Sequence, residues 1–169
     1  MIVWINGAFG VGKTTVAQRL VAELSDAALF DPEWIGFVVQ RFTAEGRRAA
    51  DFQDVARWRA WTVRCVLLWM KFYDSVIVPM TLVEPAYFAE VVDGLRARAE
   101  LRHFSLIASP EVIRARLDVR GEAAAWAAAQ IPRCAAALAE SRFAEQIATD
   151  GRSVDEIVAE IRIKLASGR

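Results

Sequence analysis

Residues 7–14 have the composition and spacing of a phosphate-binding loop. Gly7, Gly12, Lys13 and Thr14 occupy the fixed positions of the pattern G-x-x-x-x-G-K-[ST], between an apolar run and a helical pattern. In such loops backbone N–H groups surround phosphate oxygens, the lysine reaches the β- and γ-phosphates, and the hydroxyl group ligates Mg²⁺. We therefore predict that ATP binds here with Mg²⁺ on Thr14. The expected ATP contacts are Gly7, Ala8, Phe9, Gly10, Val11, Gly12, Lys13, Thr14 and Thr15.

The apolar run at 75–80 lacks the acidic end that motors and switches use to help hold Mg²⁺. Residues 76–81 have the sequence VIVPMT and end with Pro79, Met80 and Thr81. The chain also lacks an Asn-Lys-x-Asp segment for reading guanine. Both observations count against motor proteins and GTPase switches. The loop then favours a small-molecule kinase, with the second Mg²⁺ ligand left open.

Asp31 follows the second predicted strand, at the carboxyl edge of the sheet, where open α/β folds place their ligands. Its carboxylate could accept a proton from an acceptor hydroxyl or orient that hydroxyl toward the γ-phosphate, so we predict a catalytic role. The sequence Asp31-Pro32-Glu33 is also typical of an ordinary helix start, with a cap, a first-turn proline and a first-turn acid. Both interpretations stay open at this point.

Three arginines lie within residues 116–133, a region that we expect to form a lid. Arg116 and Arg120 are four residues apart and share one face of a predicted helix, and Arg133 lies on the next helix. Guanidinium groups in such positions can close over phosphates and stabilise the transferring group. We predict that Arg116 and Arg120 act with Lys13 in catalysis and ATP binding, and that Arg133 contacts the substrate.

A stripe of apolar residues at spacings of three and four predicts one long helix over 53–73; its members are Trp58, Trp61, Cys65, Trp69 and Phe72. We expect Trp69 and Phe72 to pack on the sheet. Nearer the start, aromatic rings lie beside arginines, a mixture that suits a pocket for a partly apolar, partly polar acceptor. The predicted substrate contacts here, alongside Asp31, are Phe52, Trp58, Arg59 and Trp61.

Short runs rich in β-branched and apolar residues alternate with helical patterns, which predicts a parallel sheet with helical crossovers. The predicted strands are 2–5, 28–30, 75–80, 103–108 and 146–149. The predicted helices are 12–24, 32–43, 53–73, 85–99, 110–119, 124–139 and 153–166. We expect an α/β fold with a five-stranded parallel sheet and one domain over residues 1–169.

Charge and cysteine content narrow the class further. The chain has 21 basic and 21 acidic residues, so it carries no electrostatic footprint for nucleic acid. Its two cysteines lie far apart and lack the spacing of a zinc site or disulfide framework. The sequence has no secretion signal and no run of about 20 apolar residues. We predict a cytoplasmic monomer or homodimer that acts on a small molecule, and we assign the single histidine, His103, to structure.

A series of stretches running in order over nearly the whole chain resembles the tunicamycin-resistance family of P-loop proteins. They are IVWINGAFGVGKT, DPEWIGF, DFQD, WRAW, VIVPMTLVEPAYF, HFSLIAS, RLDVR, WAAAQIPRC and IATD. The resemblance implies a three-layer P-loop NTPase fold like that of nucleotide and gluconate kinases, with ATP bound at the loop. It also implies resistance to tunicamycin, a nucleoside antibiotic that bears sugars and a fatty acyl chain.

Three functions remain open. The first is an ATP-dependent phosphotransferase that modifies a hydroxyl of tunicamycin or a related nucleoside–sugar–lipid molecule. The second is a protein that sequesters the drug in an ATP-dependent way without group transfer, and the third is a kinase of an ordinary metabolite. The better-known family member continues into a tail associated with membrane attachment, whereas this chain ends at KLASGR, so we expect no membrane association.

Overall fold

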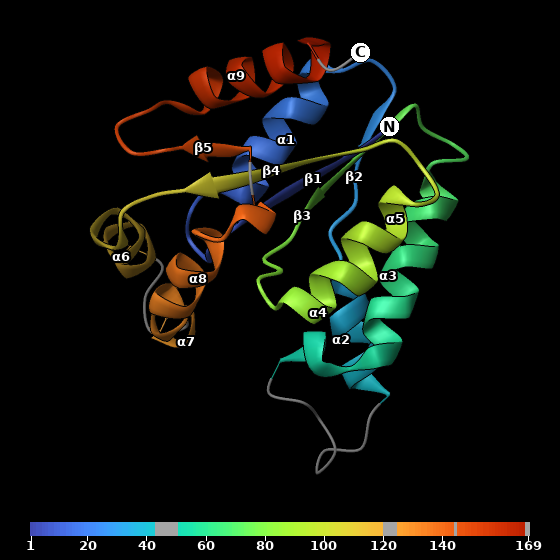
Figure 1. Ribbon diagram of the computed structural model, residues 1–169, viewed down its shortest axis with the longest axis horizontal. Coiled ribbons are helices and arrows are strands. Elements are labelled where there is room, and N and C mark those ends of the chain that lie inside the picture. The colour runs from blue at the N-terminus through green and yellow to red at the C-terminus, as the bar shows by residue number, and fades with distance from the viewer. Residues whose placement is uncertain (43–50, 120–124, 144, 168–169) are drawn as a thin grey trace.

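Five parallel strands form the centre of the molecule, in the order β2-β3-β1-β4-β5 (Figure 1). The computed structural model describes residues 1–42, 51–119, 125–143 and 145–167. The strands are β1 (Ile2–Gly7), β2 (Ala27–Leu29), β3 (Ser75–Pro79), β4 (Leu101–Ile107) and β5 (Gln146–Ala148). Each strand coincides with a predicted one to within two residues at either end.

Helices cover both faces of the sheet (Figure 1). On one face α1 (Lys13–Glu23) packs beside α9 (Val154–Ser167). The core on the other face takes apolar side chains from α2 (Glu33–Arg41), α3 (Ala56–Trp69), α4 (Pro85–Phe88), α5 (Gly94–Arg96), α6 (Pro110–Asp118), α7 (Ala125–Ala129) and α8 (Ile131–Leu138). None of the described helices has the length and apolar character needed to cross a lipid bilayer.

The two core layers alternate along the central strand. Ile2 and Trp4 of β1 belong to the core shared with α3 and its neighbours, whereas Val3 and Ile5 belong to the core shared with α1 and α9. Because both faces are buried, the strand is a continuous apolar run instead of an alternating one. The three-layer α/β fold predicted from the sequence is confirmed.

The helix predicted at 53–73 is divided in the structure. Phe52–Asp54 form a 3-10 turn, labelled η2, and α3 begins only after Val55, which is extended. The side chain of Asp51 caps the turn, because its Oδ1 accepts a hydrogen bond from the backbone N–H of Gln53 at 3.0 Å. The start of the predicted helix is therefore a separate segment, which packs against both α2 and α3.

The far end of α3 stops before the last aromatic residue of the predicted stripe. The ring of Trp69 packs 5.3 Å from the ring of Phe30 and lies, partly buried, against the core, as predicted. Phe72 lies beyond the helix and is 69% exposed, so the prediction that it packs on the sheet is wrong. The backbone N–H of Phe72 bonds to the Trp69 carbonyl at 2.9 Å, a tight turn that takes the phenylalanine off the helical stripe.

Two further predicted helices are interrupted. The helix predicted at 124–139 is split into α7 and α8 at Gln130. Pro132 explains the break, because it has no N–H to donate and its ring would clash with the carbonyl four residues earlier. The helix predicted at 85–99 contains a π-helical stretch, Ala89–Asp93, between α4 and α5. Periodicity alone does not reveal either interruption, since the surrounding residues keep a helical pattern.

His103 lies on β4, buried between aromatic rings. Its ring centroid is 4.9 Å from that of Phe88 and 6.2 Å from that of Phe143. Its Nε2 is 3.3 Å from the hydroxyl oxygen of Ser105. Burial, with a smaller effect of the Arg96 charge, lowers the pKa of His103 to about 4. This environment suits the structural role predicted for the histidine.

The substitution His103→Gln is expected to remove part of the acid sensitivity of the fold. The pKa of the imidazole drops from 6.5 to about 4 on folding, so its contribution to stability is complete above pH 6.5 and is lost as the pH falls toward 4. That loss is about 3 kcal/mol. Urea unfolding of the wild type and the variant between neutral pH and about pH 4 measures this loss of unfolding free energy. An equal loss in the two proteins would show that His103 contributes nothing to the acid sensitivity.

Candidate functional site

The loop between β1 and α1 is shaped by glycines with positive φ. Gly7 has φ +145° and Gly12 has φ +108°, conformations that side chains rarely adopt. A Cβ on Gly7 would also lie 2.7 Å from the carbonyl oxygen of Leu106, whereas a Cβ on Gly12 would meet open space. Gly7 is thus required by space and conformation, and Gly12 by conformation alone. The loop leads into the N-terminus of α1, where helical N–H groups favour an anion.

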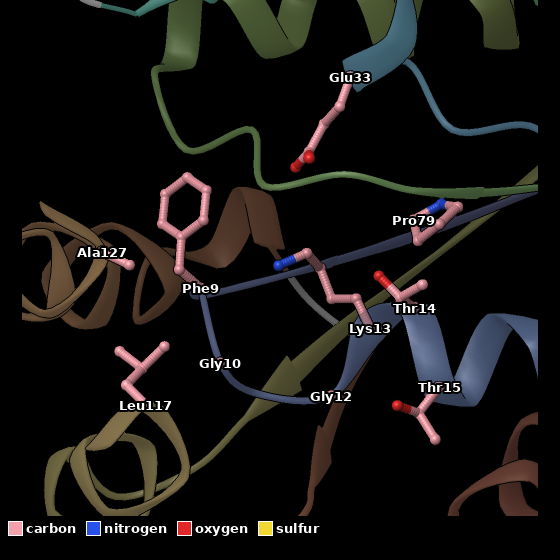
Figure 2. Close-up of a pocket in the computed structure, with 10 residues that line it drawn as sticks. All are labelled: Phe9, Gly10, Gly12, Lys13, Thr14, Thr15, Glu33, Pro79, Leu117 and Ala127. Carbon is pink, nitrogen blue, oxygen red and sulfur yellow. The ribbon is translucent and has the colours of Figure 1, made fainter. Parts of the chain in front are cut away.

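A cavity of about 280 Å³ lies over this loop (Figure 2). It is lined by Phe9, Gly10, Gly12, Lys13, Thr14, Thr15, Glu33, Pro79, Leu117 and Ala127. The Nζ of Lys13 donates to the carbonyl oxygens of Gly7 (3.0 Å) and Ala8 (2.9 Å). Figure 2 shows the Lys13 amino group and the Thr14 hydroxyl on the side of the loop that faces Glu33. The structure therefore gathers much of the predicted ATP site around one cavity.

Two buried polar side chains hold the loop where it leaves the sheet. The amide of Asn6 donates to the carbonyl of Leu82, and its Oδ1 accepts from the N–H groups of Leu82 and Gly7, all at 2.9 Å. The hydroxyl of Thr81 donates to the Gly7 carbonyl at 2.8 Å. Sequence analysis assigned no role to either side chain. Through these hydrogen bonds the two side chains join the loop to the segment that follows β3.

Glu33 is a site residue that sequence analysis read only as a first-turn acid. Its side chain extends from the start of α2 toward the loop across the cavity (Figure 2). Burial raises the pKa of the Glu33 carboxyl, the charges of Asp31 and Asp51 raise it further, and Lys13 opposes them. A signal was present in the sequence, because side chains in a first helical turn tilt toward the helix N-terminus and hence toward the sheet edge.

Asp31 occupies the capping position that sequence analysis considered as its alternative role. Its Oδ1 accepts a hydrogen bond from the backbone N–H of Glu33 at 2.9 Å. Among the described residues, Glu33 lines the cavity and Asp31 does not. Asp31 therefore stabilises the start of α2 and acts electrostatically on the carboxyl that faces the loop.

Arg116 reaches the loop from its outer side. Its Nη1 donates to the carbonyl of Val11 at 2.9 Å and to the hydroxyl oxygen of Thr149 at 3.2 Å. Its Nη2 donates to the carbonyl of Thr149 at 3.2 Å. The side chain lines a second cavity, of about 390 Å³, between the loop and the start of α9. The two cavities adjoin, because Gly10, Gly12 and Thr15 line both.

The other predicted lid arginines are placed differently. Arg120 falls outside the described residues. Arg133 is exposed on α8; burial raises the pKa of the Asp51 carboxyl, and the charge of Arg133 is a minor influence that opposes this rise. Arg133 thus acts electrostatically on the segment that precedes η2. The arginine lid stays a prediction.

The residues predicted to contact substrate from the aromatic segment divide into two groups. Trp58 is completely buried, the ring of Phe52 packs 5.2 Å from it, and the Nε of Arg59 pairs with Glu90 at 2.6 Å. These three side chains belong to η2 and α3, the elements that pack against α2. Trp61 is 50% exposed and lines a groove between α2 and α3.

The parallel sheet and the glycine-rich loop at the end of its central strand define a kinase-like P-loop nucleotide-binding protein. A family model described as an AAA domain matches residues 2–146, and the chain belongs to that family. A search of curated protein sequences gives no significant match.

Solved structures agree with this assignment. The tunicamycin resistance protein of Deinococcus radiodurans is 26% identical, with 97% of this chain and 94% of that chain covered and a TM-score of 0.82. A gluconokinase from Sinorhizobium meliloti 1021 is 21% identical over 98% and 91% of the two chains, with a TM-score of 0.66. A shikimate kinase from Bacteroides thetaiotaomicron is 15% identical over 98% of each, with a TM-score of 0.66. The resemblance to tunicamycin-resistance proteins is confirmed, and the two kinases share the fold.

The substitution Lys13→Ala is expected to weaken binding of Mg-ATP by about tenfold to a hundredfold. The reason is the loss of a charge-assisted hydrogen bond to phosphate, which contributes about 1.5–3 kcal/mol. Isothermal titration calorimetry measures the affinity, and Lys71→Ala, at an exposed lysine beyond α3, serves as the matched control. Unchanged affinity in Lys13→Ala, with the protein folded, would overturn the assignment of the loop.

Proposed function

We propose that this protein is an ATP-dependent phosphotransferase that acts on a hydroxyl group of tunicamycin or a related nucleoside–sugar molecule. The observation that carries the proposal is the cavity in which the Glu33 carboxyl lies opposite Lys13 and Thr14 of the loop. Phosphoryl transfer needs a phosphate site and a group that orients the attacking hydroxyl on facing walls. The similarity to the Deinococcus radiodurans tunicamycin resistance protein supports the choice of acceptor.

The residues around the loop fit ATP and Mg²⁺. The cradle is built from glycines that leave no Cβ in the way, and the ammonium group of Lys13 and the hydroxyl of Thr14 line it. The adjoining cavity beside Arg116 and Thr149 offers room for the nucleoside end of ATP. Thr14 would hold Mg²⁺, which neutralises charge on the phosphates when bound.

The proposed transfer assigns each side chain a part. The acceptor oxygen forms a bond to the γ-phosphorus while the bond from that phosphorus to the bridging oxygen breaks, which leaves ADP and a phosphate ester. The Glu33 carboxylate orients the acceptor hydroxyl and takes its proton, and the raised pKa of Glu33 makes this carboxylate a stronger base than an ordinary one. Lys13 stabilises the charge on the transferring phosphoryl group. Asp31 keeps α2, and with it Glu33, in place.

The substitution Glu33→Gln is expected to lower phosphoryl transfer by about 100-fold or more, since general-base catalysis contributes factors of this order. Affinity for ATP should stay within about twofold. In the wild-type protein the rate should fall as the pH drops through the raised pKa of Glu33, because the protonated carboxyl cannot accept a proton. The variant should lose this acidic limb. Mass spectrometry of tunicamycin incubated with protein and Mg-ATP measures the phosphorylated product.

Asp31→Asn is the comparison, because asparagine still caps a helix while removing the charge. A smaller loss than in Glu33→Gln is expected from it. If Asp31→Asn abolishes transfer and Glu33→Gln does not, the base is Asp31. Tight binding of tunicamycin without any modified product over many hours would refute the transferase and favour sequestration.

An apolar groove between α2 and α3 supports an acceptor with an apolar part. The groove holds about 280 Å³ and is lined by Trp34, Ile35, Val38, Val39, Phe42, Arg57 and Trp61. Trp34 is 46% and Trp61 50% exposed, although both are large aromatic residues. The groove and the cavity both take a residue from the first turn of α2, Trp34 in the groove and Glu33 in the cavity. We propose that the groove receives the acyl chain of an acceptor whose hydroxyl lies at Glu33.

The substitution Trp61→Ala is expected to raise the KM for tunicamycin by about tenfold, because about 1–2 kcal/mol of apolar contact with the chain is lost. The KM for ATP should not change. Phe72→Ala is the matched control, since that ring is exposed outside the groove. Steady-state kinetics measure both constants, and an unchanged KM for tunicamycin in Trp61→Ala would mean that the groove does not bind the acceptor.

A further inference from the structure

The indole of Trp58 forms a hydrogen bond to the residue that precedes α2. The Nε1 of this completely buried side chain donates to the carbonyl oxygen of Pro32 at 3.0 Å. Pro32 immediately precedes Glu33, the residue that faces the phosphate loop. The position of the carboxyl therefore depends on how α2 rests on the elements behind it.

One turn further along α2, Gly36 leaves a space that an aromatic ring fills. A Cβ at Gly36 would lie 2.7 and 2.8 Å from ring carbons of Phe52, closer than real Cβ contacts come. The backbone of this glycine does not have positive φ, so space and not conformation requires it. Glycine is otherwise unfavourable inside a helix. The ring of Phe52 also packs 5.2 Å from that of Trp58.

The turn that carries Phe52 cannot readily move away from α2, because Arg59 fixes it. The guanidinium group donates to the carbonyl of Gln53 at 2.6 Å and pairs with Glu90 at 2.6 Å. It also lies 4.2 Å from the centre of the Tyr87 ring. The side chain is only 11% exposed. The bond to the Gln53 carbonyl is buried, and leaving a buried charged donor without its acceptor is costly.

We propose that the contact between Gly36 and Phe52 is a positioning device that sets the Glu33 carboxyl against the phosphate loop. The proposal rests on the function proposed above for Glu33. Gly36 is three residues from Glu33, so a side chain at Gly36 would push on the same face of the helix that carries the carboxyl. Relieving a contact of 2.7 Å to the ordinary 3.4–4 Å requires a shift of about 0.7–1.3 Å, and misplacement on that scale can reduce catalysis by about 100-fold.

The test is the substitution Gly36→Ala in the full chain. The expected result is a kcat lower by about tenfold to a hundredfold, with the KM for ATP within about twofold. The acidic limb of the kcat profile should also shift, because a displaced carboxyl changes its burial and its distances from Asp31 and Lys13, which together set its pKa. Gly94→Ala is the matched control, since a Cβ there meets only the end of the Arg98 side chain at 3.5 Å. Its kinetics should match the wild type.

A double variant separates positioning from general damage. Alanine at residue 52 lacks the Cγ, Cδ1 and Cδ2 atoms that a Cβ at Gly36 would meet, so Gly36→Ala with Phe52→Ala should recover activity to within about threefold of Phe52→Ala alone. Full kcat and an unchanged pH profile in Gly36→Ala would overturn the proposal, and so would a double variant no better than Gly36→Ala.

A measurement without substrates keeps this inference distinct from the proposed function. NMR titration of the labelled Glu33 carboxyl should show a changed pKa in Gly36→Ala and recovery of the wild-type pKa in the double variant. An unchanged Glu33 pKa would refute the positioning device even if the enzyme is active. Absence of phosphoryl transfer by the wild type would refute the proposed function, while the titration would still decide whether Gly36 and Phe52 position the carboxyl.

Discussion

The buried amide of Asn6 fixes the point at which the phosphate loop leaves the sheet. Its oxygen and nitrogen are both bonded, to Gly7 on the loop and to Leu82 on the segment after β3. Without these partners a buried amide would carry a large desolvation penalty, so the bonds define one geometry. The Gly7 carbonyl in turn accepts from both Lys13 and Thr81. The hydrogen bonds of Asn6, on β1, therefore help to fix the position of the Lys13 side chain at the cavity.

On the side of the cavity opposite the loop, two carboxylates have different roles. Asp31 binds the backbone N–H of Glu33 and so ends the strand segment and starts the helix in one place. The Glu33 side chain then tilts back past the helix N-terminus toward the loop. Burial makes its anion less stable, and Lys13 across the cavity is the opposing influence. A helix cap thus places a carboxyl with a raised pKa opposite a phosphate site.

The sequence alone predicts the features whose cause is local. The phosphate loop is predicted by the fixed spacing of its glycines, lysine and threonine. The strands are predicted by continuous apolar runs, because helices bury both faces of the sheet. Glu33 was missed because a first-turn acid is also an ordinary helix feature, and only the packing of α2 shows where its side chain lies. Phe52 packs closely on Gly36 and Arg59 pairs with Glu90, and periodicity does not reveal either contact.

The tryptophans near the start of α3 show why the same local pattern can serve stability and binding. Trp58 is fully buried and donates to the carbonyl of Pro32, so its polar atom and its ring are both used within the protein. Trp61, one turn on, leaves half of its surface in water beside an apolar groove. Exposed aromatic surface of this kind is stabilised only when an apolar partner covers it. The buried ring holds the start of α2, which carries Glu33, and the exposed ring lines the groove in which we propose that the apolar part of an acceptor binds.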